Sequence, residues 1–203
     1  MYKVFVNDRP IIFTSSLKNE EDLPLLKIKN IVISRVINQV KTGKLKGVYL
    51  FSNTLEGDWL AFCKKYNMIK AGGGLVSNDE NELLFIYRAK KWDLPKGRID
   101  GDEDIQDTAL REVKEECGIQ NLEIKQFLLN TYHFYYDNRK LRLKKIYWYL
   151  MHTDHKGKLN PLLEEGIKKA EFKKSDAVAK ALKKTYANVR TVFAKYNDLN
   201  IEN

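Results

Sequence analysis

The chain has 203 residues, of which 43% are hydrophobic, and it carries a formal net charge of +9. This length suits one large domain, or one medium domain with a small appendage, and the hydrophobic fraction is ample for a packed core. No run of 18 apolar residues is present, which excludes a membrane-spanning helix, and the first residues lack the pattern of a signal peptide.

The positive charge favours polyanionic partners such as nucleotides, polyphosphates or nucleic acid, but lysines spread over the surface for solubility would give the same total. The two cysteines, Cys63 and Cys117, lie far apart and show neither a metal-ligand spacing nor a disulfide framework. Such cysteine usage fits a reducing compartment, so we expect a cytoplasmic protein.

The first 70 residues alternate between strand and helix patterns and contain no group of residues that we can assign to chemistry. We interpret residues 1–70 as a small α+β appendage of unknown role. A module of this kind can pair with its own copy, which makes a homodimer one hypothesis. The predicted elements are strands at 2–6, 11–14 and 47–52, and helices at 30–42 and 56–67.

The remainder, residues 71–203, predicts a second domain with a mixed sheet between helices, of the α/β class. The run of glycines at 72–74 marks a junction or a strand that other backbone approaches closely. Asp102 or Asp104 could cap a helix that Gly118 ends. The predicted elements are a strand at 83–87, a helix at 104–117, two or three strands within 122–151 and a final helix at 175–196.

Three carboxylates, Glu112, Glu115 and Glu116, share one face of the helix predicted at 104–117. Like charges on one face repel, and a divalent cation would cancel that repulsion. Hard oxygen ligands suit Mg²⁺ or Mn²⁺. The alternative is a solvated helix on which Arg111 and Lys114 are salt-bridge partners. A loop rich in glycine precedes the helix and would let backbone approach a phosphate.

The segment from Gly97 to Ile119 resembles the Nudix box, G-x5-E-x7-R-E-U-x-E-E-x-G-U, in which U is a bulky aliphatic residue. Every required position is filled, and the resemblance extends over residues 71 to 197. The matching residues are Gly97, Glu103, Arg111, Glu112, Val113, Glu115, Glu116, Gly118 and Ile119.

The resemblance implies a Nudix fold and hydrolysis of a nucleoside diphosphate linked to another group X. It implies that Glu112, Glu115 and Glu116 bind Mg²⁺ or Mn²⁺ and activate water, and that Gly97 helps to hold the metal through backbone atoms. Arg111 would orient the glutamates, and Glu103 would pair within the loop and helix.

A further glutamate after the later strands often serves Nudix enzymes as metal ligand or general base. Glu164 and Glu165 both qualify, and a solvated turn explains them equally well. We name Glu165 as the catalytic candidate and leave Glu164 open.

Markers of substrate lie outside the box. Tyr135 and Tyr136 follow it at the distance of a tyrosine in dinucleoside polyphosphate hydrolases, and residues 92–97 (WDLPKG) look like the entry to the box in those enzymes and in diphosphoinositol polyphosphate hydrolases. Base stacking would explain such a tyrosine, although sheet packing does so too. Arg142 belongs to a basic run suited to a phosphate chain, and Lys96 is a candidate phosphate contact.

These features favour a dinucleoside polyphosphate, such as diadenosine tetraphosphate, as the substrate. Diphosphoinositol polyphosphates and other nucleotide diphosphate derivatives are the alternatives within the class. From another class, a Nudix domain could sense a nucleotide metabolite without cleaving it. The intact glutamates oppose that alternative, and residues 1–70 show no helix-turn-helix pattern that would favour a nucleic-acid partner.

Overall fold

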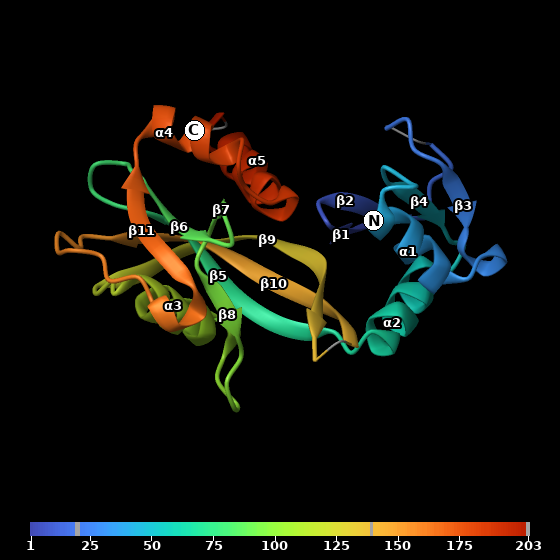
Figure 1. Cartoon of the computed structure of the whole chain (residues 1–203), viewed down its shortest axis with the longest axis horizontal. Coiled ribbons are helices and arrows are strands. Elements are labelled where there is room, and N and C mark those ends of the chain that lie inside the picture. Colours follow the sequence, from blue (N-terminus) through green and yellow to red (C-terminus); the bar gives the residue numbers. More distant parts are fainter. Residues whose placement is uncertain (19–20, 139, 202–203) are drawn as a thin grey trace. The chain divides into compact units, whose positions relative to one another are not determined.

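The computed structural model describes residues 1–18, 21–138 and 140–201, and the chain folds into two compact units. The sequence predicted one boundary at residue 70 and assigned all of 71–203 to the second domain. The structure instead places residues 132–144 with the first unit, because these ends of two long strands join its sheet and core (Figure 1). The first unit comprises Met1–Ile69 and Tyr132–Lys144, and the second comprises Lys70–Thr131 and Lys145–Asn203.

The first unit contains a mixed sheet in which neighbouring strands follow the order β9, β1, β2, β4, β3. β1 and β2 form an antiparallel hairpin whose turn residues, Asn7 and Asp8, have positive φ. β4 lies between β2 and β3 and is parallel to both. The sequence did not predict β3, because three residues are too few to show a strand period. The strands are β1 (Tyr2–Val6), β2 (Arg9–Thr14), β3 (Leu25–Lys27) and β4 (Val48–Phe51).

Helices α1 (Ile33–Thr42) and α2 (Leu55–Lys65) pack their apolar sides into one core with this sheet. The helix predicted at 30–42 begins three residues later, because residues 28–30 form a separate 3-10 turn, η1 (Ile28–Asn30). Gly43 ends α1 in the left-handed conformation. This unit therefore combines helices with a mixed sheet, in which β1 and β2 are antiparallel and α1 connects two strands that run parallel.

The second unit contains a sheet with the strand order β11, β6, β5, β10, β9. Short strands β7 and β8 pair with β6 and β5, respectively. The glycine run lies within β5, where a Cβ on Gly72 would come within 2.7 Å of the Ala109 backbone nitrogen. It is therefore a closely approached strand rather than a junction. The strands are β5 (Ile69–Ser77), β6 (Leu83–Arg88), β7 (Lys91–Asp93), β8 (Lys96–Arg98), β9 (Leu122–Asp137), β10 (Lys140–Thr153) and β11 (Ile167–Lys173).

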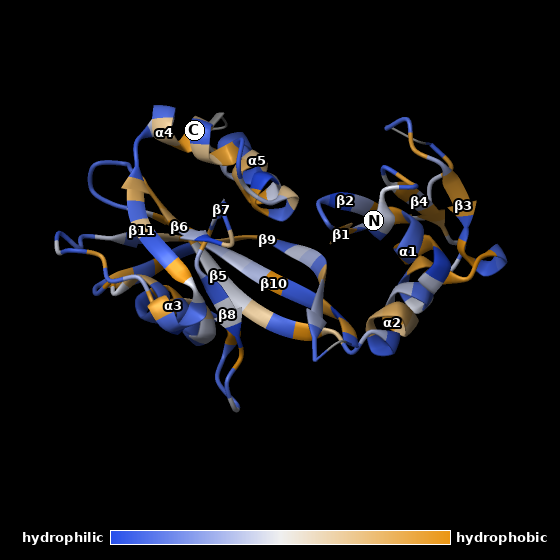
Figure 2. Cartoon of the chain, in the orientation of Figure 1, coloured by the Kyte–Doolittle hydropathy of each residue, from blue (hydrophilic) through white to orange (hydrophobic). Residues whose placement is uncertain are grey.

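Helices cover both faces of this second sheet, which confirms the predicted mixed sheet between helices. α3 (Ile105–Cys117) buries Ala109, Val113 and Cys117 against one face. α4 (Ser175–Leu182) and α5 (Ala187–Ile201) pack against the other face, with a separate core. Figure 2 shows both hydrophobic and hydrophilic residues along these helices, as expected for helices with one buried side and one exposed side.

The single helix predicted at 175–196 is wrong, because the structure divides it into α4 and α5. The break is held by β7: the Trp92 N–H donates to the Lys184 carbonyl, and the Thr185 hydroxyl donates to the Trp92 carbonyl at 2.6 Å. Thr185 is buried. A tertiary contact of this kind leaves no trace in the local periodicity of the sequence.

Within the described residues, no helix combines the length and the apolar character that a membrane crossing would need.

Candidate active site

Helix α3 is positioned by capping at both ends and by one apolar face. The Asp104 side chain accepts a hydrogen bond from the Gln106 N–H, so Asp104 rather than Asp102 caps the helix. Gly118 ends it with φ of 70°. Because Ala109, Val113 and Cys117 face the core, the adjacent face turns its glutamates toward the loop that precedes the helix.

The three box glutamates differ sharply in their surroundings. Glu112 and Glu116 are buried, whereas the side chain of Glu115 is half exposed. Burial raises the pKa of Glu112 and raises that of Glu116 to about 7. The face is therefore not a solvated helix surface.

Gly97, on β8, leaves the space that Glu112 occupies. A Cβ at position 97 would overlap the carboxyl group of Glu112. Any other residue would displace this carboxylate, and the requirement for glycine at the start of the box therefore has a direct steric reason.

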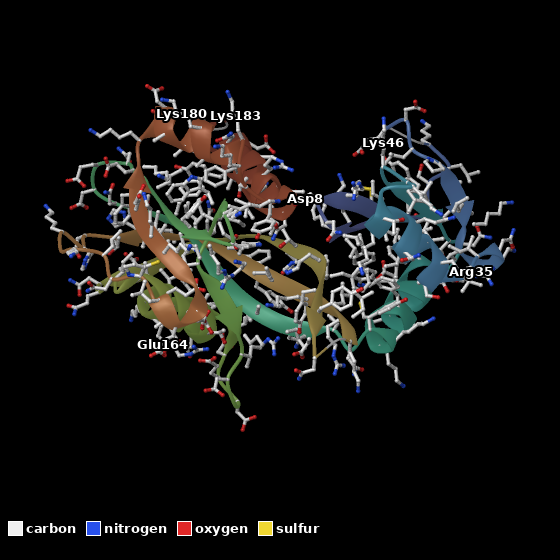
Figure 3. The ribbon with its side chains drawn as sticks, in the orientation of Figure 1. Asp8, Arg35, Lys46, Glu164, Lys180 and Lys183 are labelled. Carbon is white, nitrogen blue, oxygen red and sulfur yellow. The ribbon has the colours of Figure 1, made fainter. Side chains whose placement is uncertain are left out.

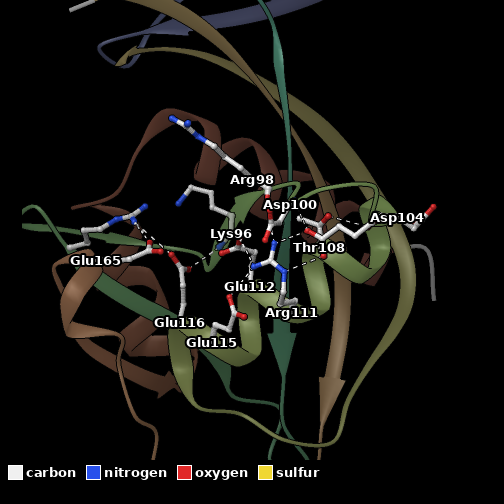
Figure 4. Close-up of polar contacts among 12 residues, drawn as sticks. Lys96, Arg98, Asp100, Asp104, Thr108, Arg111, Glu112, Glu115, Glu116 and Glu165 are labelled. Carbon is white, nitrogen blue, oxygen red and sulfur yellow. Dashed lines mark hydrogen bonds and ion pairs between the residues drawn. The ribbon is translucent and has the colours of Figure 1, made fainter. Parts of the chain in front are cut away.

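Arg111 connects the loop to the carboxylates (Figure 4). Its guanidinium donates to Glu112 at 3.0 Å and to Glu115 at 2.8 Å. It also makes a two-point contact with Glu103, at 2.7 and 3.1 Å, and reaches the Arg98 carbonyl. One side chain thereby fixes the entry loop, Glu103 and two of the box glutamates.

Glu103 braces the loop in return. Its carboxylate accepts hydrogen bonds from Arg111 and from the Asp100 N–H, and these bonds lower its pKa to about 2. Glu103 therefore holds loop and helix together, without contacting the other box glutamates in the structure.

Glu116 has one satisfied and one unsatisfied oxygen. Its Oε2 accepts a hydrogen bond from the Lys96 N–H at 2.9 Å. Its buried Oε1 has no hydrogen-bond partner among the described residues, and the Arg88 guanidinium lies 3.6 Å from it. A buried carboxylate oxygen without a hydrogen-bond partner keeps a lone pair available to a ligand.

Arg88, at the end of β6, completes the cluster and was not identified from the sequence. It lies 3.6 Å from both Glu116 and Glu165 and 3.7 Å from Asp93. Glu164 and Glu165 both belong to the exposed 3-10 turn η2 (Leu163–Glu165), and Glu165 is the one that contacts Arg88 (Glu164 is labelled in Figure 3). The one sequence signal for Arg88 was a cation at the end of a strand that precedes the box.

Lys96 does not occupy the position expected of a phosphate contact. Its side chain is buried, and its ammonium group binds the Asp93 carboxylate and the Leu94 carbonyl. The Lys96 ammonium therefore stabilises the shape of the loop, and the Lys96 backbone N–H orients Glu116.

The other predicted substrate contacts, Tyr135, Tyr136 and Arg142, belong to the first unit, while the box belongs to the second. Lys144 lies 4.7 Å from the Tyr135 ring centroid. Tyr136 instead contacts Lys41, through both its hydroxyl and its ring. The two tyrosines therefore differ in the structure: Tyr135 lies beside Lys144 of the basic run, and Tyr136 lies beside Lys41.

The chemistry of the donors fits a hard divalent cation. Oxygen ligands are supplied by the glutamates, Glu116 Oε1 is unsatisfied, and Gly97 keeps backbone close to Glu112. Across the described ranges, no three acidic, His or Cys side chains are already gathered in a metal-holding arrangement. The reason is visible in the contacts, since Arg111 holds both Glu112 and Glu115.

Sequence comparison places residues 69–196 within a family model described as the NUDIX domain. A curated relative, an RNA pyrophosphohydrolase of Bartonella tribocorum, is 44% identical over 52 residues. That match covers 26% of this chain and 29% of the relative, so the chain spans under a third of that protein's length.

Solved structures show the same fold at low identity. The Ap4A hydrolase of C. elegans, in a binary complex, is 21% identical with a TM-score of 0.52, covering 66% of this chain and 99% of that one. The NUDIX domain of Shewanella oneidensis NrtR, complexed with ADP ribose, is 15% identical with a TM-score of 0.51, covering 70% and 97%.

Proposed function

Because the chain belongs to the Nudix family, we propose that it is a metal-dependent pyrophosphohydrolase of nucleoside diphosphates linked to X, with a dinucleoside polyphosphate as substrate. The observation that carries the proposal is the buried Glu116, whose Oε1 has no hydrogen-bond partner among the described residues, four positions along α3 from the Glu112 carboxylate that Gly97 accommodates. A buried carboxylate oxygen without a hydrogen-bond partner costs free energy, which a bound cation would offset.

Mg²⁺ or Mn²⁺, when bound, would polarise phosphoryl oxygens and lower the pKa of water. We assign Glu112, Glu115 and Glu116 as its side-chain ligands and Gly97 as a backbone contact. Arg111 would then contact two of the carboxylates that bind the cation, Glu112 and Glu115, and the Lys96 backbone N–H would keep Glu116 oriented. The protein's main task is to position charge, as phosphoryl transfer requires.

In the reaction that we propose, water attacks phosphorus and the anhydride P–O bond breaks. Glu165 is the candidate to accept the proton of the attacking water, because it lies beside Arg88, which also approaches Glu116. Arg88 is the cation best placed to contact a phosphate, taking the role that the sequence assigned to Lys96.

Three observations support a dinucleoside polyphosphate. The entry residues 92–97 and the downstream tyrosine keep the pattern of such hydrolases, and an Ap4A hydrolase shares the fold. Tyr135 and Arg142 stay predictions from the sequence, in which the ring would stack on a base and the guanidinium would contact a phosphate chain. Tyr136 is the weaker candidate, because Lys41 already engages it.

The test is turnover of a substrate panel with added Mg²⁺, with products separated by anion exchange. The panel contains diadenosine tetraphosphate, ADP-ribose, nucleoside triphosphates, a diphosphoinositol polyphosphate and a 5′-triphosphorylated RNA. We expect release of ATP plus AMP from the dinucleotide, abolished in Glu115→Gln. Preference for another member would replace the substrate while keeping the mechanism. Tight binding of a ligand without any turnover would instead support a sensing role.

A further inference from the structure

The first unit has the topology of a ligand-binding sheet. β2, β4 and β3 run parallel, and α1 connects β3 to β4. In open sheets with parallel strands, ligands bind in crevices outside the carboxyl ends of the strands. In this unit those ends are Thr14, Phe51 and Lys27.

A cavity of about 490 Å³ lies at these strand ends. This volume is within the range of small-molecule sites. The cavity is lined by residues at or just after the C-terminal ends of β2, β3 and β4 and by the start of α2. The lining residues are Leu17, Lys27, Ile28, Lys29, Phe51, Ser52, Asn53, Thr54 and Asp58. The cavity therefore lies where the topology alone would place a ligand.

The polar floor of the cavity is preorganised. Ser52 is buried, and its hydroxyl donates to Asp58 Oδ2 at 2.6 Å while accepting from the Thr54 N–H. The Thr54 hydroxyl also donates to Asp58 Oδ2, at 3.3 Å. These contacts fix the Asp58 carboxylate as a hydrogen-bond acceptor, which suits hydroxyl groups on a ligand.

The walls carry two other kinds of group. Lys27 and Lys29 are exposed and supply two ammonium groups on the β3 side. Leu17, Ile28 and Phe51 supply apolar surface. A flat apolar group on the ligand would cover this surface.

We propose that this cavity binds a nucleoside monophosphate, at a site separate from the box and not required for the hydrolysis proposed above. The phosphate is placed at Lys27 and Lys29, the ribose hydroxyls at Asp58, and the base against Phe51, Ile28 and Leu17. The Asp58 acceptor, the two ammonium groups and the apolar surface thus match the sugar, the phosphate and the base of this ligand class. Neither inorganic phosphate nor a free nucleoside would use all of them.

The experiment is equilibrium dialysis of the full chain against AMP, adenosine and inorganic phosphate, with EDTA present so that metal-dependent binding at the box is removed. The test variant is Lys27→Ala/Lys29→Ala. Its matched control is Lys44→Ala/Lys46→Ala, which removes two exposed lysines at the same spacing in the same unit (Lys46 is labelled in Figure 3). A second test variant, Asp58→Asn, removes the acceptor charge with little change in shape.

We expect saturable binding of AMP, at least about tenfold tighter than adenosine or phosphate, since the lysines contribute charge-assisted bonds. The lysine test variant should weaken AMP binding about tenfold and leave adenosine binding unchanged, with the control at the wild-type value. Asp58→Asn should weaken both AMP and adenosine. Absence of AMP binding to wild type, equal losses in the test and control variants, or adenosine binding as tight as AMP would each overturn the proposal.

Discussion

Substitution of Gly97 by alanine tests the steric argument for the site. The new Cβ would overlap the Glu112 carboxyl group, so the carboxylate must swing away or β8 must shift. Forcing one extra methyl into a packed site costs about 1–3 kcal/mol. A displacement of about 1 Å at a reacting centre can cost about 100-fold in rate. We therefore expect kcat to fall about 100-fold and the free energy of unfolding to fall by about 1–3 kcal/mol.

The assay combines steady-state turnover of the substrate identified from the panel with urea unfolding. Gly57→Ala is the matched control, because a Cβ there has no atom within 4 Å and α2 tolerates alanine. Gly101→Ala is a second control in the same loop, with open space but a φ of 56°. It should lose some stability through backbone strain and keep most of its turnover. Turnover of Gly97→Ala within about threefold of wild type would refute the reasoning.

The remaining predictions concern charge, pH and the core. Arg88→Ala should lower kcat/KM by about 100-fold, because Asp93, Glu116 and Glu165 then lose the Arg88 cation. Arg88→Lys should restore part of this activity. Equal kcat/KM values for the wild type and both variants would remove Arg88 from the site. Glu103 has its pKa lowered to about 2, so the stability that it contributes is present above about pH 4.5 and is lost as the pH falls toward 2. Urea unfolding of Glu103→Gln and wild type should accordingly differ at pH 6 and converge near pH 2, and a constant difference would contradict the assignment. Thr131→Val should lower the free energy of unfolding by about 1–3 kcal/mol, because the buried Trp148 indole N–H then loses its acceptor, the Thr131 hydroxyl at 2.8 Å. Thr131→Ser keeps the hydroxyl and should unfold near the wild-type urea midpoint.

Local patterns predicted most elements because their signals are contained within a few residues. The alternation of 2–6 predicted β1, and the capping residues at the two ends of 104–117 predicted α3 together with its terminal Gly118. Elements that depend on distant partners were missed or merged. β3 exists because β4 pairs with it, and the break between α4 and α5 exists because Trp92 binds there.

The sequence by itself determined the family, because nine residues at fixed spacing on a loop, one helix and the residues that end it need no tertiary information to be brought together. Only the tertiary structure decided which charges meet. It placed Arg88 beside Glu116 and Glu165, turned the Lys96 ammonium to Asp93, and gave residues 132–144 to the first unit. It also gathered three parallel strand ends around one cavity. Contacts between residues tens of positions apart depend on strand pairing and register, which a one-dimensional pattern does not encode.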